Sequence, residues 1–314
     1  MFRKQKTPQR LSLQKASKNL QYLVLSIPTI LLLIAFSYIP MFGLVLPFKN
    51  YKVVDGIWGS DWMSPLFKNF EFFFKSKNAG RVIRNTLGLN VLFIGTSTIC
   101  AVVFALLLFE VKNPKHVKLY QTFAILPSFL SWVAVSYIVY GLLETDKGII
   151  NKLIISLGGS KVNWYNNPTL WPAILTVVNI WHDVGLSCLI YYAALMGIDD
   201  SLFEAAEVDG ATKWAKIWNV SIPQLVPIIT MMTILKIGGI FRADFGLFYN
   251  VTRNVGVLYP TTDVMDTFVY RALLGNGDIG MSSAASFIQS IVCFVTIVLV
   301  NLIVKKVDKD KALF

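Results

Sequence analysis

Three ionisable side chains lie inside apolar stretches of the sequence, where an isolated charge is costly. His182 and Asp183 are neighbours in the middle of the run 171–196, and Lys236 lies near the end of the run 225–241. Because hydrocarbon cannot solvate such groups, they usually face a cavity or pair with one another. They could line a path for a polar solute; alternatively, His182 and Asp183 satisfy each other while Lys236 extends its amine to the membrane surface.

Catalytic and metal-binding patterns do not occur in the sequence. The two histidines, His116 and His182, belong to no H-E-x-x-H pattern, and there is no G-x-S-x-G pattern. Cys100, Cys188 and Cys293 lie singly in apolar runs, so we expect buried small side chains rather than a zinc site or a disulfide. The sequence therefore predicts neither an enzyme nor a metalloprotein.

The composition and the lengths of the apolar runs indicate a membrane protein. The 314 residues are 55% hydrophobic and 15% charged, with a mean hydropathy of +0.58, which argues against a soluble enzyme. The net charge of +11 is spread over the connections between runs, so it does not indicate a nucleic-acid-binding face. Since about 20 apolar residues cross the bilayer core as a helix, we predict an all-α, polytopic membrane protein with six transmembrane helices. These helices are expected at 22–46, 87–109, 119–143, 171–196, 225–241 and 283–304.

The segments outside these runs define the expected organisation and orientation. Residues 1–21 form a basic tail, 47–84 a loop with an amphipathic, interfacial stretch, 85–304 a core with five spans, and 305–314 a second tail. The basic tail ahead of the first span indicates that both termini lie in the cytoplasm. Over the whole chain about 15 Lys and Arg side chains then lie inside and about 13 outside, so the charge count alone barely favours this orientation.

The connection between the fourth and fifth spans has the pattern of two short helices. Ser201 and Glu204 have the spacing of a capping box, and Gly210 is the residue type that ends a helix in a left-handed turn. A second amphipathic helix that carries Trp214 is expected next, and Pro223 would open the following span. A simple connection needs only a few residues, so this ordered elbow at 199–224 suggests a surface that meets another protein.

This elbow closely resembles the cytoplasmic EAA loop of type I ABC import permeases. The family pattern is Glu-Ala-Ala, three residues, Gly, nine residues and then Ile-x-Leu-Pro, and Asp and Ala flank the glycine in the sugar-type variant. In this sequence the pattern stands as Glu204-Ala205-Ala206, Asp209-Gly210-Ala211 and Val220-Ser221-Ile222-Pro223.

The similarity extends over about 85–304 and points to carbohydrate uptake. The stretches that resemble sugar permeases are Arg84-Asn85-Thr86, Pro127, Gly148-Ile149-Ile150-Asn151, Leu157-Gly158, and Trp181 with Gly185. Residues 266–271 and 280–286 resemble the branch that serves oligosaccharides and polysaccharide fragments. One departure concerns the substrate subclass, since many sugar permeases carry Thr-x-Gly-Gly-Pro where this chain has Thr252-Arg253-Asn254-Val255-Gly256.

The resemblance implies the type I ABC importer permease fold and a set of partners. They are a second permease subunit, expected to be a different but related chain, two cytoplasmic ABC ATPase subunits and an extracytoplasmic solute-binding protein that delivers the carbohydrate. The sequence has no G-x-x-x-x-G-K-[ST] phosphate loop, so ATP and Mg²⁺ are expected on the ATPase and no cofactor on this chain. The implied location is the bacterial inner membrane, where the chain is a multi-pass protein.

Two groups of site residues follow. The residues expected to couple to the ATPase are Glu204, Ala205, Ala206, Asp209, Gly210, Ala211, Trp214 and Pro223. Sugars bind to aromatic faces and hydrogen-bonding side chains, so the candidates for the substrate pathway are Asn179, Trp181, His182, Asp183, Tyr137 and Tyr140. At about 100° per residue, Asn179 can share a helix face with His182 and Asp183, whereas Trp181 points elsewhere.

Other functions remain open at this level. The chain could be an ABC permease for a polyamine, an amino acid or another small solute. An ion-driven secondary transporter should show internal repeats, which we do not find, and it gives the elbow no role. A membrane scaffold without transport activity would leave the buried His182 and Asp183 unexplained.

Overall fold

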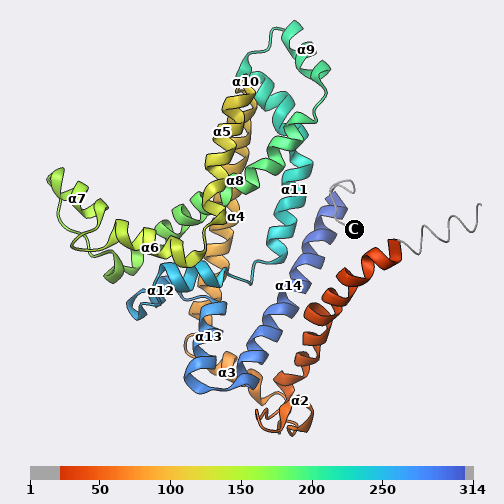
Figure 1. The fold of residues 1–314 in the computed structure, drawn as a ribbon, viewed down its shortest axis with the longest axis vertical. Helices are drawn as coiled ribbons and strands as arrows, with labels where there is room; N and C mark the ends of the chain where they lie inside the picture. Colours follow the sequence, from red (N-terminus) through yellow and green to blue (C-terminus); the bar gives the residue numbers. More distant parts are fainter. Residues whose placement is uncertain (1–21, 308–314) are drawn as a thin grey trace, which may run out of the picture. The chain divides into compact units, whose positions relative to one another are not determined.

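The computed structural model describes residues 22–307, and short connections join its helices (Figure 1). Its described residues form two compact units, 22–71 with 278–284 and 72–277 with 285–307. The predicted tail 1–21 and residues 308–314 lie outside the described part. After the first span, the α-helices are α2 Gly56–Gly59, α3 Lys68–Lys75, α4 Ala79–Phe109, α5 Pro114–Ile125, α6 Trp132–Leu143, α7 Ile149–Ser156, α8 Trp171–Met196, α9 Asp200–Val208, α10 Lys213–Lys216, α11 Ile222–Gly238, α12 Tyr259–Thr262, α13 Met265–Asn276 and α14 Ile279–Val307.

Short 3₁₀ and π turns extend or join these helices. They are η1 Ile34–Tyr38, η2 Ile39–Phe48, η3 Leu126–Phe129, η4 Trp164–Asn166, η5 Pro168–Leu170, η6 Ile217–Ser221, η7 Leu247–Val251 and η8 Gly256–Leu258.

Five continuous helices among the described residues are long and apolar enough to cross a membrane. They confirm five of the predicted spans, and they run over Tyr22–Phe48, Ala79–Phe109, Pro168–Met196, Lys213–Gly238 and Ile279–Lys306.

The predicted third span is not one straight helix. It consists of two arms, Pro114–Phe129 and Trp132–Leu143, whose axes differ by 99°. Pro127 has no backbone N–H to continue the ladder, and the Ser131 side chain accepts a hydrogen bond from the N–H of Ala134 at 3.3 Å, which starts a new helix. The bent pair supplies the sixth candidate span if it is counted as one.

The amphipathic stretch expected before the second span is shorter than predicted. Helix α3 carries Lys68 and Lys75, but Arg81 and Arg84 belong to α4, which begins at Ala79 rather than at residue 87. Both arginines bind polar groups outside the apolar run, so the helix can begin ahead of that run.

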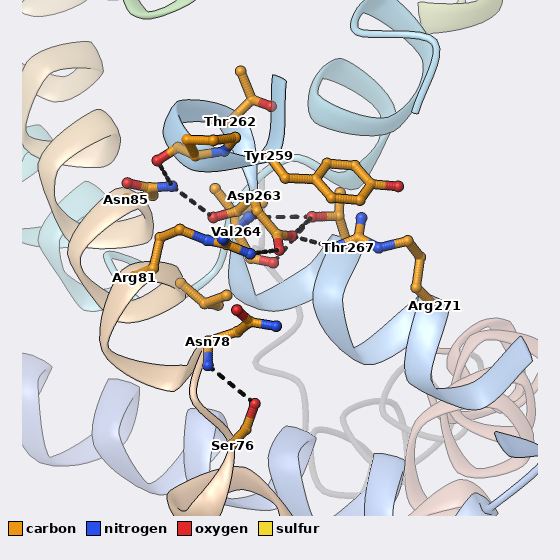
Figure 2. Close-up of polar contacts among 12 residues, drawn as sticks. Ser76, Asn78, Arg81, Asn85, Tyr259, Thr262, Asp263, Val264, Thr267 and Arg271 are labelled. Carbon is orange, nitrogen blue, oxygen red and sulfur yellow. Dashed lines mark hydrogen bonds and ion pairs between the residues drawn. The ribbon is translucent and has the colours of Figure 1, made fainter. Parts of the chain in front are cut away.

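The partners of these arginines join the start of α4 to α12 and to the residue between α12 and α13. Arg81 and Arg271 both pair with Asp263, whose side chain is only 2% exposed, and Asn85 donates to the carbonyl oxygen of Asp263 at 3.1 Å (Figure 2). The N–H of Met265 donates to the Thr86 hydroxyl at 2.9 Å. Two stretches that resemble sugar permeases, one opening α4 and one in α13, therefore meet at a single buried carboxylate.

Small residues bring α4 and α8 close together. Ala101 and Ala105 on α4 are fully buried and pack with Cys188, Tyr191 and Leu195 of α8. Small side chains are typical where membrane helices approach closely. Figure 1 shows α8 and α11 running beside α4 toward the end of the molecule that carries α9.

Helix α8 also crosses α5 at Gly185. A Cβ built on Gly185 would lie 1.9 Å from the carbonyl oxygen of Ala124, so only glycine fits this crossing. By contrast, a Cβ built on Gly95 of α4 meets no atom of the described part of the chain within 4 Å.

We expect Gly185→Ala to lower the thermal unfolding midpoint of the purified protein, because overpacking costs about 1–3 kcal/mol. Gly95→Ala is the matched control and should leave the midpoint unchanged or raise it slightly, since alanine has the higher helix propensity. Differential scanning fluorimetry in detergent measures both variants. Equal midpoints for the two would contradict the close crossing of α8 and α5.

Candidate functional site

The elbow between α8 and α11 begins with a capped helix. Its cap is Asp199, whose side chain accepts a hydrogen bond from the N–H of Ser201 at 2.9 Å. The predicted capping box of Ser201 with Glu204 is therefore wrong. Helix α9 starts at Asp200, so Ser201 already lies inside its first turn, where its own N–H needs a partner.

The first arm of the elbow ends at Gly210, as predicted. Gly210 has a φ of +75°, its N–H donates to the carbonyl of Glu207 at 3.0 Å, and the N–H of Ala211 donates to that of Ala206 at 2.9 Å. This pair of bonds is the Schellman arrangement, which satisfies the last carbonyls of a helix. Glycine adopts this left-handed conformation without the steric cost that a Cβ adds.

The second arm is not a separate short helix. Thr212 caps it by accepting from the N–H of Ala215 at 3.3 Å, and the helix then runs without a break from Lys213 to Gly238. Pro223 lies inside this helix instead of opening it. The π turn η6 precedes the proline, and the N–H of Ile222 donates to Ile217 there, so the backbone passes the proline without ending.

The elbow exposes a mixed apolar and acidic surface. Val208 is 89% exposed, Trp214 is 72% exposed, and Glu204 and Ala205 are also exposed. Lys216 donates to Glu207 at 2.6 Å, and this hydrogen bond lowers the pKa of the Glu207 carboxyl below its ordinary value. The ion pair joins the two arms, so the exposed surface has a defined shape.

Contacts also tie the elbow to α4. Phe203 of α9 packs against Phe109 at the end of α4 with ring centroids 5.7 Å apart, and Lys213 lies 3.7 Å from Glu110. Because α8 leads directly into α9 and the second arm is the start of the next span, a displacement of the elbow must move these three helices.

A polar cavity of about 230 Å³ lies among the same helices. Asn179, Asp183 and Ser187 line it from α8, at positions four residues apart, and so share one face. Asn179 is buried and donates to Ser97 of α4 at 3.0 Å. Lys236 of α11 also lines the cavity, which places this side chain inside the bundle.

The predicted pair His182–Asp183 divides between the cavity and the packing. Asp183 lines the cavity, whereas His182 is buried and stacks on Trp132 with centroids 4.0 Å apart. The His182 ring lies 2.7 Å from the Asp183 carboxylate through Nδ1 and 3.2 Å from the carbonyl oxygen of Leu130 through Nε2. His182 therefore positions Asp183 and holds the bend between η3 and α6.

The aromatic candidates lie elsewhere. Trp181 is 43% exposed and Tyr137 is 66% exposed, and neither lines the cavity. Tyr140 packs against Tyr165 at 5.6 Å and lies beneath the Arg253 guanidinium at 4.1 Å, also away from the cavity. Burial raises the pKa of Tyr165 to about 12.

Several cavity residues were not among the sequence candidates. They are Asn90, Ser97, Ser187, Arg242 and Asp244. A helical period of polar residues within the apolar runs would have found the first three, because Asn90 and Ser97 are seven residues apart and Asn179, Asp183 and Ser187 follow each other at intervals of four.

The multi-span helical fold, the polar cavity among the spans and the exposed elbow together define a solute permease. Residues 9–309 match the family model described as "Binding-protein-dependent transport system inner membrane component", so the chain belongs to this family and is a multi-pass membrane protein.

Two curated relatives from Bacillus subtilis (strain 168) are similar over nearly their whole lengths. Protein LplB is 32% identical over 289 residues, which cover 92% of this chain and 89% of LplB. The polygalacturonan/rhamnogalacturonan transport system permease protein YteP is 32% identical over 313 residues, which cover 99% of this chain and 95% of YteP.

A solved structure has the same fold. It is a chain of a bacterial alginate ABC transporter in complex with an alginate pentasaccharide-bound periplasmic protein, and it matches with a TM-score of 0.83 and 28% sequence identity over 94% of this chain and 98% of that chain. This chain therefore has the type I ABC importer permease fold that its elbow residues predicted.

Proposed function

We propose that this chain forms half of the transmembrane path of an ATP-driven importer for an oligosaccharide. The observation that carries the proposal is the cavity among α4, α8 and α11, whose lining combines amide, hydroxyl, carboxylate and cationic groups. Sugar hydroxyls both donate and accept hydrogen bonds, so such a lining can replace their water. The polygalacturonan and alginate transporters that the chain resembles support this substrate class.

The elbow is the proposed site of coupling to the ATPase. Glu204, Ala205 and Trp214 offer an exposed surface, and the arms on either side continue into the helices that carry Asp183 and Lys236. Closure of an ATPase pair against the elbow would thus move the cavity wall. ATP and Mg²⁺ belong to the ATPase in this scheme, and this chain transports without catalysing a reaction.

The remaining partners in this proposal are a second, related permease and an extracytoplasmic binding protein. The alginate transporter was solved with such a periplasmic protein, which supports the second of these. Both termini lie in the cytoplasm of a bacterial cell, so the elbow faces the ATPases and the α6–α7 connection faces outward.

We expect Gly210→Val to uncouple transport, because a β-branched residue at a φ of +75° costs about 1–3 kcal/mol locally. No atom of the described residues lies within 4 Å of a Cβ built at this position, so strain in the backbone and not a clash would be the cause. Gly210→Asn is the control, since asparagine tolerates this conformation. The measurements are co-purification with the ATPase and sugar-stimulated ATP hydrolysis, and wild-type values for the valine variant would refute the coupling role.

We expect Asn179→Ala and Asp183→Ala to lower sugar uptake about three- to tenfold, because each removes hydrogen-bonding groups from the cavity. Trp181→Ala is the matched control on the same helix and should transport normally. Uptake and ATP hydrolysis are measured in reconstituted vesicles after assembly has been verified. His182→Ala should also lower uptake, because it removes the ring that contacts and positions the Asp183 carboxylate. Wild-type rates in Asn179→Ala, His182→Ala and Asp183→Ala would assign the polar groups to packing alone.

The orientation is tested by labelling single cysteines with a membrane-impermeant maleimide. In a background without Cys100, Cys188 and Cys293, a thiol from Ser160→Cys should react from outside and one from Val208→Cys should not. Both positions are exposed, whereas Asp263 on the outer side is buried in its ion pairs and unsuitable. The opposite labelling pattern would reverse the topology.

A further inference from the structure

A second cavity, of about 270 Å³, lies against the segment that follows α11. Asp266 and Tyr270 line it from one face of α13, Ser286 and Gln289 line it from α14, and Phe245 lines it from the segment that follows α11. None of these residues contributes to the polar cavity described above. Its volume suits a single sugar ring, being slightly below the range of pockets for drug-sized ligands.

The polar side chains of this cavity are fixed by bonds that use only part of their capacity. Asp266 accepts through Oδ2 from the N–H of Ala243 at 2.8 Å and from Nε2 of Gln289 at 3.1 Å. The same Nε2 donates to the carbonyl of Phe241 at 2.6 Å. Within the described residues, Oδ1 of Asp266 and Oε1 of Gln289 accept no hydrogen bond from another residue. Both oxygens belong to side chains that are fixed by other hydrogen bonds, and both can accept a hydrogen bond from a ligand.

Two aromatic residues of the lining, Phe245 and Tyr270, pack with a third ring, that of Tyr249. Phe245 stacks on Tyr249 with centroids 4.9 Å apart and an angle of 17°, and it meets Tyr270 edge-on at 4.8 Å. Tyr249 also meets Tyr270 edge-on at 5.2 Å. Because each ring is held by the other two, the apolar wall is formed before a ligand arrives, which reduces the cost of binding.

We propose that this cavity is a second saccharide-binding site, which takes the hydroxyl-bearing face of a neutral sugar ring. The proposal deepens the proposed function and rests on it. Hydroxyl groups would donate to the two open oxygens while the apolar face of the ring lies on Phe245 and Tyr270. The Asp266 carboxylate disfavours a uronate, and no Lys or Arg among residues 22–307 lines this cavity, whereas Lys236 and Arg242 line the first one.

The position of the site suggests its place in transport. Arg242 and Asp244 line the first cavity, Phe245 lines the second, and Ala243 between them bonds to Asp266. The two cavities thus share one short stretch of backbone as a wall. A sugar bound in the second cavity would therefore contact the segment whose neighbouring residues line the first cavity.

The test uses the assembled importer in lipid nanodiscs and two trisaccharide probes, neutral xylotriose and galacturonan trisaccharide. Binding is measured by saturation-transfer difference NMR. Ser286→Trp fills the cavity mouth from an exposed position without removing a side-chain hydrogen bond, and Ile291→Trp, also exposed on α14 but outside the cavity, is the control. We expect xylotriose to bind more tightly than the acidic probe, and Ser286→Trp to weaken xylotriose binding at least tenfold while Ile291→Trp does not.

The outcomes separate this site from the proposed function. Binding-protein-dependent uptake by the wild type tests the importer itself and does not depend on the second cavity. If uptake occurs but xylotriose fails to bind, binds no better than the acidic probe, or is lost with Asn179→Ala and not with Ser286→Trp, the second site is wrong and the importer stands. If uptake of every oligosaccharide offered fails although Ser286→Trp still abolishes xylotriose binding, the transport proposal fails and the site stands.

Discussion

Backbone groups left unpaired where a helix breaks among apolar spans must find partners in other side chains, because lipid offers none. The segment after α11 is such a break. Asn90 of α4 donates to the carbonyl oxygens of Ile240 at 2.7 Å and Arg242 at 3.0 Å, and Gln289 of α14 donates to that of Phe241. Three elements distant in sequence are thereby joined at one short stretch of irregular backbone. Both cavities lie against this stretch, so their shapes depend on the same few hydrogen bonds that the side-chain amides of Asn90 and Gln289 donate.

The bend in the third span obeys the same constraint. The carbonyl oxygen of Leu130 lies at the break, 3.2 Å from Nε2 of His182, and the Trp132 indole N–H donates to the Asp244 carboxylate at 2.8 Å. The two neighbouring ionisable residues that stand out in the sequence, His182 and Asp183, therefore have different roles. His182 contacts the Leu130 carbonyl and the Asp183 carboxylate, and Asp183 lines the cavity. Lining a cavity and pairing with a neighbouring residue are therefore not exclusive for Asp183.

The spans and the turn of the elbow could be predicted from the sequence, while helix directions and exact ends could not. An apolar run indicates the length of a span but not the direction of its helix axis. The run 119–143 therefore predicts one span, although Pro127 and Ser131 divide it into two arms. Gly210 was predictable because few residue types adopt its conformation. The N-cap was not, since Asp199 and Ser201 are both good caps two residues apart, and only the fold decides between them. Pro223 was misread because sequence alone does not reveal the π turn before it.

The departure from the sugar-permease pattern after the fifth span has a local physical explanation. Arg253 and Asn254 both have positive φ, 55° and 51°, and Asn254 stands at a position where the pattern has glycine. Asparagine is the non-glycine residue that best tolerates this conformation, and its side chain accepts hydrogen bonds from Tyr259 at 2.9 Å and Arg271 at 3.3 Å. The Arg253 guanidinium lies over the ring of Tyr140. Strain of about 1–3 kcal/mol at Asn254 is therefore offset by side-chain hydrogen bonds that a glycine could not make. Tyr140, expected in the substrate pathway, instead helps to hold this turn, so the departure replaces conformational freedom with side-chain bonds.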